Sequence, residues 1–399
     1  LSYQHNHALP VGDALNDWGL GGQARARWNL NRVSDDNYWR DFPRTSTTLT
    51  SRLLNNEAEV SWSRDAWQFS GLVNEWQTLQ DVEQPITSPF NRIPSMALRY
   101  DRSGLAWAGV NGWNASVYSE WTRFERKRTA VEPSADALNG DRSVAVIRLG
   151  HDLQAPGWFF KPKVQWHATR YQLDLPDDEG QQVITRGVPT ASLDTGLVFE
   201  RDAKWGDAAY LMTLEPRAFL SWTPYKKQSN PIYDTAVTEF NMSSIFSENT
   251  WGGNDRLSDT RALTLGLSTR YLRAQDGAEL LRLGVAQRLT LEDCVGQDGC
   301  PQTSSQPLSD VLVEAHAQWD DRWSAELSAQ LDQDTQETRR SIATARYSPS
   351  NYRTLSASYR YQNPKVVDAA NPGVEVEHAH RHAGAQQRGQ RALPLHRPR

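Results

Sequence analysis

The chain has 399 residues, a formal net charge of −5 and 38% hydrophobic residues. No run approaches the roughly eighteen consecutive apolar residues of a membrane-spanning helix. An α-helical membrane protein is therefore excluded. The 43 Lys and Arg do not outnumber the 48 Asp and Glu, so a basic nucleic-acid binder is excluded as well. The 16 Trp and 13 Tyr fit a carbohydrate-binding β protein or a transmembrane β-barrel, whose wall is apolar at every second position.

Strict alternation of apolar and polar residues recurs along most of the chain and predicts strands with one apolar and one polar face. From Trp158 onward, Phe160 and Trp166 share one face and Lys161 and Lys163 the other. The same alternation occurs at 263–271, 310–319 and 323–332. Counting by this pattern predicts about fourteen to sixteen strands. The polar faces are expected to carry Glu57, Glu59, Lys161, Lys163, Arg270, Glu314, His316 and Glu326.

The connections between the expected strands alternate in length. Short turns are expected near 63–66, 108–112, 152–157, 201–207, 274–277, 320–322 and 348–351, and long loops near 78–93, 128–141, 174–188, 224–259 and 292–308. The connection near 334–337 is short where the alternation calls for a long one. A soluble sandwich has no reason to place the long loops at one end, whereas an outer-membrane barrel has short periplasmic turns and long extracellular loops.

Aromatic pairs bracket several of the short turns. They are Trp62 with Trp67, Trp107 with Trp113, Trp319 with Trp323, and Tyr347 with Tyr352. Such rings suit the headgroup level of a bilayer, so we expect half of an aromatic girdle at this end of the strands. Ordinary cross-strand pairing near hairpin turns is the alternative.

A proline lies inside one expected strand, in the run Glu215-Pro216-Arg217. Proline cannot donate to the hydrogen bonds of a sheet, so a bulge or an edge is expected there. Glu215 and Arg217 are two positions apart and project to the same face, where a polar interior would satisfy both charges.

The long connection 224–259 contains apolar residues of its own, including Phe240, Ile245 and Trp251. A loop of this length must bury them, either by folding into the barrel or by packing on itself at the surface, and both options remain open. The internal polar contacts expected to order this loop are Glu215, Arg217, Asp255 and Arg256.

No motif indicates catalysis: the sequence has no GxSxG elbow, no HExxH and no phosphate-binding glycine loop. We expect no enzymatic activity, no cofactor and no metal site. Cys294 and Cys300 lie close together in an expected external loop, where a local disulfide is favoured over two free thiols. His378, His380 and His382 lie in a tail that is expected to be disordered rather than metal-binding.

Several motifs, in order, resemble those of the outer-membrane lipopolysaccharide-assembly proteins of the LptD family, also called OstA or Imp. They are Val33-Ser34-Asp35-Asp36-Asn37-Tyr38-Trp39-Arg40-Asp41-Phe42, Pro89-Phe90-Asn91-Arg92-Ile93-Pro94, Thr213-Leu214-Glu215-Pro216-Arg217, Tyr233-Asp234, Phe240, Phe246, Trp251-Gly252-Gly253-Asn254-Asp255-Arg256, Gly266-Leu267-Ser268-Thr269-Arg270 and Tyr359-Arg360-Tyr361. The resemblance covers about 1–363. Cys294 and Cys300 do not match the family's cysteine positions.

The resemblance implies a large barrel that, with a plug lipoprotein of the LptE type, receives lipopolysaccharide from periplasmic bridge proteins. The barrel delivers it to the outer leaflet of the cell outer membrane of a Gram-negative bacterium. Outer-membrane lipids and the barrel-assembly machinery are further implied partners, and no nucleic-acid partner is expected.

We therefore expect an all-β chain. Residues 1–363 would form a transmembrane antiparallel outer-membrane β-barrel, partial and truncated at both ends, with no jellyroll domain in this chain; residues 364–399 would form a disordered or frameshifted tail. The alternative functions are a passive porin or sugar-uptake barrel, and a secreted carbohydrate-binding β protein that stacks sugars on its Trp residues.

Overall fold

The computed structural model describes residues 2–9, 21–37, 52–81, 84–107, 109–126, 138–175, 180–206, 208–292, 307–350 and 353–363. Within these ranges, eighteen strands form one antiparallel sheet and two short strands form another. The described residues contain no helix that is long and apolar enough to cross a membrane.

The main sheet is an antiparallel meander whose neighbouring strands follow chain order. Its first strands are β1 (Ser2–Leu9), β2 (Gln23–Asn31), β3 (Leu53–Arg64), β4 (Trp67–Thr78), β5 (Asn91–Trp107), β6 (Val110–Glu125), β7 (Gly140–His151), β8 (Leu153–Ala155) and β9 (Trp158–Asp174). They are followed by β10 (Gln181–Leu197), β11 (Phe199–Trp205), β12 (Ala208–Thr223), β15 (Thr260–Arg273), β16 (Glu279–Thr290), β17 (Val311–Gln318), β18 (Trp323–Leu331), β19 (Thr338–Ser350) and β20 (Arg353–Gln362). The small sheet pairs β13 (Ala236–Val237) with β14 (Trp251–Gly252).

Two of the eighteen strands continue the strand before them. β8 follows β7 after a break at Asp152, and both pair with β9. β11 follows β10 after a break at Val198, and both pair with β12. The eighteen strands therefore make sixteen passes within the described residues, at the upper end of the predicted range.

The break at Val198 has its cause in the opposing strand. Pairing of β10 with β12 ends at Gly196 and Arg217 and resumes in β11 at Phe199 and Leu214. Pro216 lies in the interval and has no N–H to donate, so the ladder lapses there. The register is the same on both sides of this gap, and Pro216 stays paired with Leu267 of β15, so the structure shows a lapse in pairing where the sequence predicted a bulge or an edge.

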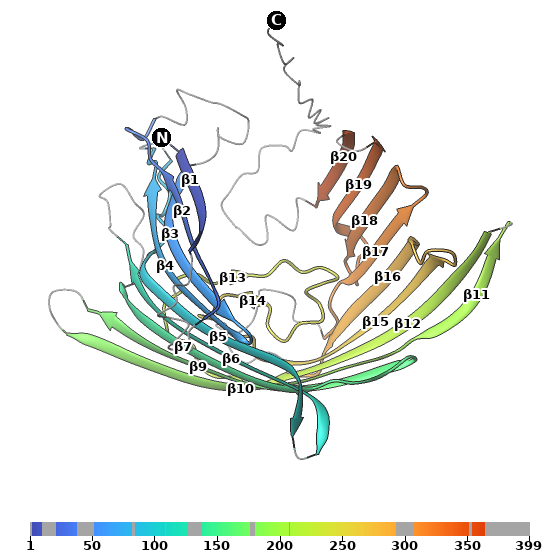
Figure 1. Cartoon of the computed structure of the whole chain (residues 1–399), viewed down its shortest axis with the longest axis horizontal. Helices are drawn as coiled ribbons and strands as arrows, with labels where there is room; N and C mark the ends of the chain where they lie inside the picture. Colours follow the sequence, from blue (N-terminus) through green and yellow to red (C-terminus); the bar gives the residue numbers. More distant parts are fainter. Residues whose placement is uncertain are drawn as a thin grey trace, which may run out of the picture.

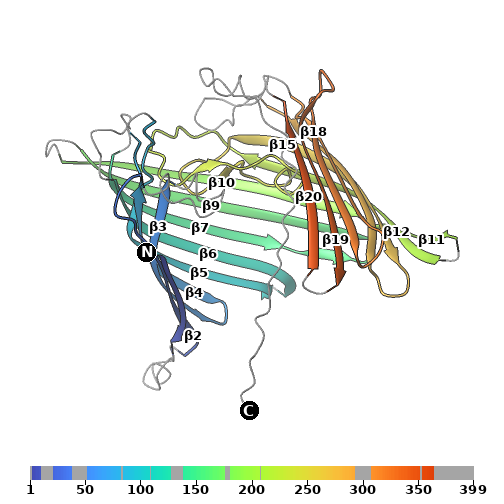
Figure 2. The same ribbon diagram turned by 90° about the horizontal axis from the view of Figure 1, so that it is seen from above.

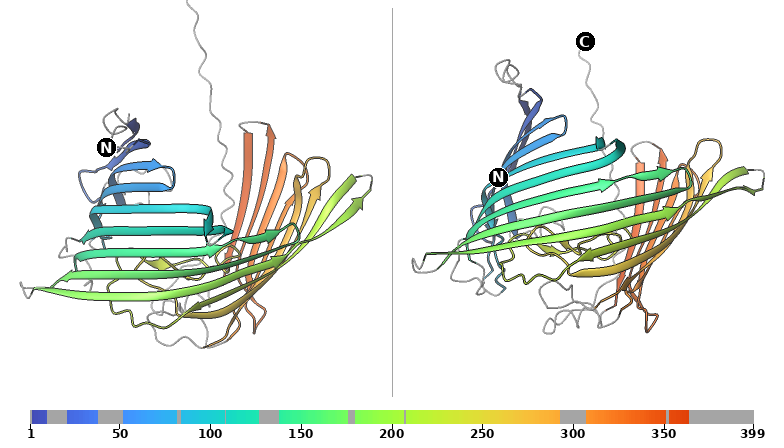
Figure 3. Two further views of the ribbon diagram at one scale, coloured as in Figure 1. Left: turned by 60° about the horizontal axis from the view of Figure 1, so that its bottom comes forward. Right: turned by 90° about the horizontal axis from the view of Figure 1, so that it is seen from below.

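The main sheet curves into an open trough (Figure 1). Because the sheet is strongly twisted, β15–β20 lie at a steep angle to β3–β10 (Figure 2). Strands β1 and β20 form the two edges of the sheet. β1 pairs with β2, and β20 pairs with β19. Two further views show them at opposite ends of the same continuous wall (Figure 3). Over the described residues the fold is thus an all-β wall of barrel type, curved but not closed.

The two faces of the wall differ in chemistry, as the alternation predicted. On β9, Val164 and Trp166 face outward with 54% and 49% of their surface exposed, whereas His167 and Thr169 face the concave side and are buried. On β15, Leu265 is 55% exposed and neighbouring Thr264 is 1% exposed. The apolar face is therefore the convex one, as in a barrel that meets lipid.

The connections alternate in length, as predicted, with two corrections. The short turn predicted at 201–207 is mostly strand, because β11 extends to Trp205. Short turns follow β3, β5, β8, β11, β15, β17 and β19, and most of the longer connections leave the opposite end. The long loop predicted at 174–188 is wrong, because β9 extends to Asp174 and β10 begins at Gln181. The polar residues of this stretch suggested a loop, but they extend the hairpin.

Aromatic side chains gather at the short-turn end. Trp107 and Trp113 lie 5.2 Å apart between ring centroids, edge to face, and Trp323 and Tyr347 lie 4.4 Å apart. Trp319 is 68% exposed. Tyr352 lies outside the described residues. Both pairs lie on neighbouring strands, so the contacts also fit ordinary cross-strand pairing, and the interfacial girdle stays a prediction.

Candidate functional site

The connection between β12 and β15, residues 224–259, lies within the concavity of the sheet (Figure 1). We call it the inner loop, and we call the concave face of the sheet the inner wall. Hairpin β13–β14 shapes part of the loop. Of the two placements left open by the sequence, the structure shows the one inside the trough.

A buried arginine of the wall joins the inner loop to β6 and β7. The Arg142 side chain is fully buried and donates hydrogen bonds to three carboxylates. It contacts Asp234 at 2.6 and 2.8 Å, Asp255 at 2.7 Å and Glu120 at 2.7 Å. A buried charge is tolerated only when it is paired and hydrogen-bonded, so this contact depends on the loop being in place.

Asp255 is the acceptor at the centre of this network and is also fully buried. The Tyr171 hydroxyl donates to it at 2.9 Å, and the backbone N–H groups of Tyr233 and Asp234 donate at 2.8 and 3.0 Å. Burial alone would raise the pKa of Asp255, but the Arg142 guanidinium and these donors outweigh it and lower the pKa. Asp255 is therefore held as a carboxylate.

A second buried arginine, Arg186 of β10, secures the same part of the loop. It donates to the side chain of Gln228 at 2.5 Å and to the backbone carbonyls of Asp255 and Asn254 at 2.8 and 2.9 Å. Gln228 in turn donates to the carbonyl of Leu257 at 2.7 Å. Irregular backbone inside the trough thus has its carbonyls satisfied by the wall.

An aromatic cluster packs beside the arginines. Tyr233 of the loop stacks on Phe124 of β6 with ring centroids 4.2 Å apart, and it meets Phe90 edge to face at 4.8 Å. Tyr171 and Leu173 complete the buried cluster. The motif residue Phe90 therefore helps to hold the inner loop.

The loop makes a second apolar contact with β15–β17. Ile245 is fully buried against Leu312, and Phe246 lies against Gly266. A Cβ at Gly266 would be 2.6 Å from the Phe246 ring, so the close approach requires glycine. The Arg217 guanidinium covers the same ring at 4.1 Å from its centroid.

The four polar residues proposed from the sequence have different surroundings. Asp255 joins loop and wall, as described above. Arg217 contacts the loop through Phe246 and binds both carboxylate oxygens of Asp194 at 2.8 Å.

The other two, Glu215 and Arg256, do not join the loop to the wall. Glu215 receives hydrogen bonds from Arg270 at 2.8 and 2.6 Å, so its ion pair lies within the wall and not with Arg217. Arg256 donates to the carbonyl of Asn230 at 2.9 Å, within the loop. Cys294 and Cys300 lie outside the described residues, and so does the histidine-containing tail.

Sequence reasoning did not single out Arg142 or Arg186, and it noted Asp234 only as part of a family motif and not as a contact. A signal was present in β7, where Val144 and Val146 share the inner face with Arg142 and interrupt the polar pattern. Apolar residues on a polar face indicate that something covers that face. Here the cover is the inner loop.

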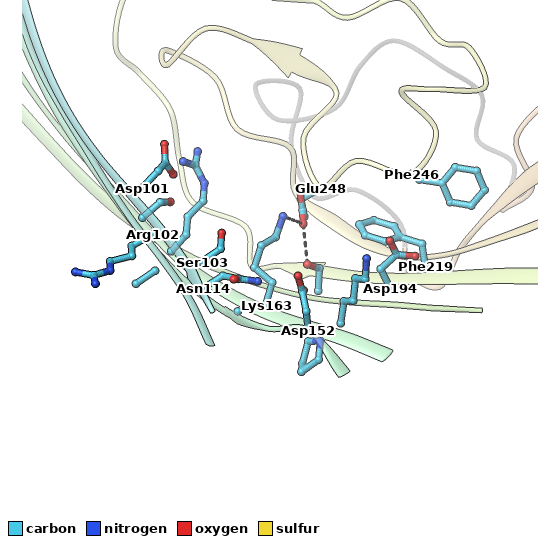
Figure 4. A pocket seen from close by; sticks show the side chains of 17 residues that line it. Asp101, Arg102, Ser103, Asn114, Asp152, Lys163, Asp194, Phe219, Phe246 and Glu248 are labelled. Carbon is cyan, nitrogen blue, oxygen red and sulfur yellow. Dashed lines mark hydrogen bonds and ion pairs between the residues drawn. The ribbon is translucent and has the colours of Figure 1, made fainter. Parts of the chain in front are cut away.

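The inner wall also bears a groove of about 330 Å³ beside the inner loop (Figure 4). It lies toward the short-turn end, because β9 begins at Trp158 directly after a short turn. Its lining includes Arg148 of β7, Lys161 and Lys163 of β9, Ser192 and Asp194 of β10, and Glu248 of the inner loop. The volume is in the range of small-molecule sites.

Comparison with known proteins identifies the family. Residues 3–388 match the family model LptD, described as LPS transport system D. The LPS-assembly protein LptD of Albidiferax ferrireducens is 42% identical over 371 residues, which cover 91% of this chain and 44% of that protein. The LPS-assembly protein LptD of an Acidovorax species is 43% identical over 374 residues, covering 88% and 45%. The chain thus spans less than half the length of these curated relatives.

A more distant relative and a solved structure complete the comparison. The LPS-assembly protein LptD of Ralstonia nicotianae is 34% identical over 368 residues, covering 90% of this chain and 43% of that protein. The siderophore receptor PirA from Acinetobacter baumannii aligns with a TM-score of 0.38 and 9% identity over 85% of this chain and 62% of that one, too weakly to add to the argument. The family resemblance inferred from the motifs is confirmed, and the chain belongs to the LptD family of outer-membrane β-barrel proteins of Gram-negative bacteria.

Proposed function

We propose that this chain forms part of the wall of a barrel that inserts lipopolysaccharide into the outer leaflet of the outer membrane. The observation that carries the proposal is the division between an apolar outer face and a polar, ion-paired inner face, in a chain of this family. Lipopolysaccharide also has an apolar and a charged part. Its acyl chains require an apolar route across the membrane, and its charged sugars require a hydrated one.

The open edges fit this function within a longer wall. Unpaired strand edges cannot face lipid, because their N–H and C=O groups would have no partners there. In relatives of more than twice this span, further strands would pair with β1 and β20 and close the barrel. The inner loop would then lie within the lumen and narrow the polar route.

We further propose the partners that membership of the family implies. They are a plug lipoprotein of the LptE type, the periplasmic bridge proteins that deliver lipopolysaccharide, the outer-membrane lipids and the barrel-assembly machinery. The family match favours this function over the passive porin or sugar-uptake barrel, and over the secreted carbohydrate-binding protein.

Purification from outer membranes tests the proposal. The protein would be detected with an antibody raised against residues 224–259, extracted in mild detergent, and assayed for bound lipopolysaccharide and for a small lipoprotein. We expect both to copurify, and we expect little solute flux after reconstitution into vesicles. A protein that carries neither and conducts sugars across vesicles would contradict the proposal and restore the porin alternative.

A further inference from the structure

Two inward-facing cations of the groove, Arg148 and Lys161, form no ion pair with a carboxylate among the residues that the structure describes. Arg148 donates its Nε–H to the side-chain oxygen of Gln165 at 2.6 Å. The Lys161 ammonium lies 5.3 Å from the centre of the Phe159 ring. Both project from the inner wall, and both retain donors that these contacts do not use.

Most carboxylates around the groove are already engaged. Asp194 lies opposite Lys161 across the strands but is bound through both oxygens by Arg217, and Asp101 pairs with Arg99. Asp152 lines the groove without an ion pair in the described structure. The unpaired cations therefore outnumber the unpaired carboxylate.

The groove already binds one anionic group, which the inner loop supplies. The Glu248 carboxylate lies 2.5 Å from the Lys163 ammonium and accepts a hydrogen bond from the Ser192 hydroxyl at 2.7 Å (Figure 4). An ammonium and a hydroxyl that converge on one oxygen acceptor form an anion-binding arrangement. This contact also tethers the loop to the short-turn end of the wall.

We propose that the groove is a subsite for a phosphate group carried on a sugar. Arg148 and Lys161 are its permanent cations, and Lys163 joins them when Glu248 is displaced. This inference rests on the proposed function, in which the phosphorylated sugars of lipopolysaccharide pass along the inner wall. Inorganic phosphate presents the same chemistry to the groove.

Binding and loop anchoring then compete for the same ammonium group. A phosphate carries more charge and more acceptor oxygens than a carboxylate, so it can replace Glu248 on Lys163 and also reach Arg148. Arrival of the ligand at the short-turn end would thus release one tether of the inner loop. The buried network around Asp255 would keep the rest of the loop in place.

The test compares three ligands on the full chain in detergent micelles: intact lipopolysaccharide, lipopolysaccharide stripped of phosphate, and inorganic phosphate. The variant R148Q/K161Q should bind intact lipopolysaccharide about 10- to 100-fold more weakly, as expected for losing charge-assisted hydrogen bonds. Its affinity for the stripped lipid should match that of the wild type. The matched control is R282Q, which removes a wall cation that pairs with Glu279 outside the groove.

Two further variants separate binding from misfolding. R148K/K161R keeps both charges and should restore most of the affinity. E248Q weakens the internal competitor for Lys163 and should bind phosphate-bearing ligands more tightly than the wild type, a gain that a folding defect cannot produce.

The outcomes distinguish the subsite from the proposed function. If inorganic phosphate competes as well as the intact lipid, free phosphate is the ligand and the subsite stands. If the wild type binds phosphate through these residues but never binds lipopolysaccharide, the subsite stands and the proposed function falls. If R148Q/K161Q and the wild type bind intact lipopolysaccharide and inorganic phosphate equally, the subsite is overturned, whatever the fate of the function.

Discussion

Asp255 and Arg142 are 113 residues apart in the chain, and their side chains meet at 2.7 Å with neither exposed to solvent. Arg142 belongs to the wall and Asp255 to the inner loop. The pair is embedded in hydrogen bonds from Tyr171 and from the loop backbone. This pair therefore holds the inner loop against the wall.

Substitution of Asp255 by Asn should release the inner loop. Arg142 keeps Asp234 and Glu120, but the amide offers only one acceptor oxygen where the carboxylate offers two, so buried donors such as the backbone N–H groups of Tyr233 and Asp234 lose their acceptor. Leaving a buried hydrogen-bonding group unsatisfied costs about 1–3 kcal/mol. We expect the free energy of opening the loop, measured by hydrogen exchange of its backbone amides, to fall by about that amount.

The matched control is Asp276→Asn at a turn. Asp276 pairs with Arg273 at 3.0 Å, but its side chain is 52% exposed. Such a pair contributes only about 0–1 kcal/mol. Equal effects of the two substitutions would mean that burial of the Asp255 pair does not stabilise the loop.

Docking of the loop should depend on pH in the acid range only. The pKa values of Asp255 and Glu248 are lowered, against the effect of burial, by Arg142 and Lys163 respectively. Their stabilisation is thus fully present above the ordinary carboxyl pKa values and is lost as the pH falls below them. Hydrogen exchange of residues 230–256, corrected for intrinsic rates, should stay constant from neutral pH to about pH 5 and then rise. Faster exchange that begins already near pH 6 would show that groups other than these two carboxylates control docking of the loop.

The two faces of one strand should respond in opposite ways to a new charge. Leu327 lies on the outward face of β18 and is 43% exposed, and adjacent Glu326 lies on the inner face. Leu327→Arg should lower the free energy of unfolding from lipid vesicles by about 2–4 kcal/mol, whereas Glu326→Arg should change it by less than about 1 kcal/mol. A larger effect of Glu326→Arg would reverse the assignment of the two faces.

The contact between Phe246 and Gly266 can be tested with two substitutions. Gly266→Ala places a Cβ against the ring and should destabilise the loop by about 1–3 kcal/mol, as overpacking does. In a Phe246→Ala background the same change should cost almost nothing, because the clash is gone. Purely additive costs in urea unfolding would show that the two residues do not meet.

The strands could be predicted from the sequence because each records its own two faces. In β9, the outward Val164 and Trp166 and the inward Lys161 and Lys163 alternate with no information from elsewhere. The proline irregularity was local in the same way, because Pro216 lacks a donor in any context. The hairpin of β9 and β10 was predicted too short, because the polar residues near its tip resemble a loop.

The network around the inner loop could not be predicted in the same way. Arg142 meets Asp234 and Asp255 only because the loop returns across several strands, and no spacing in the sequence records that path. The family motif marks Asp255, but no feature of the sequence marks Arg142 as its partner. Val144 and Leu312, apolar residues on an otherwise polar face, were the local signs of a covering segment.

The most direct test of the proposed route uses a photocrosslinking amino acid at two adjacent positions of β9. Gln165 faces the inner wall and Val164 faces outward, so the pair differs in face and hardly in height. Newly made lipopolysaccharide would be pulse-labelled, and crosslinks would be sampled before the label reaches the cell surface. We expect the label at Gln165, disappearing during the chase, and none at Val164 at that stage. Label at Val164 first, or equal label at both positions, would contradict passage of the lipid's sugars along the inner wall.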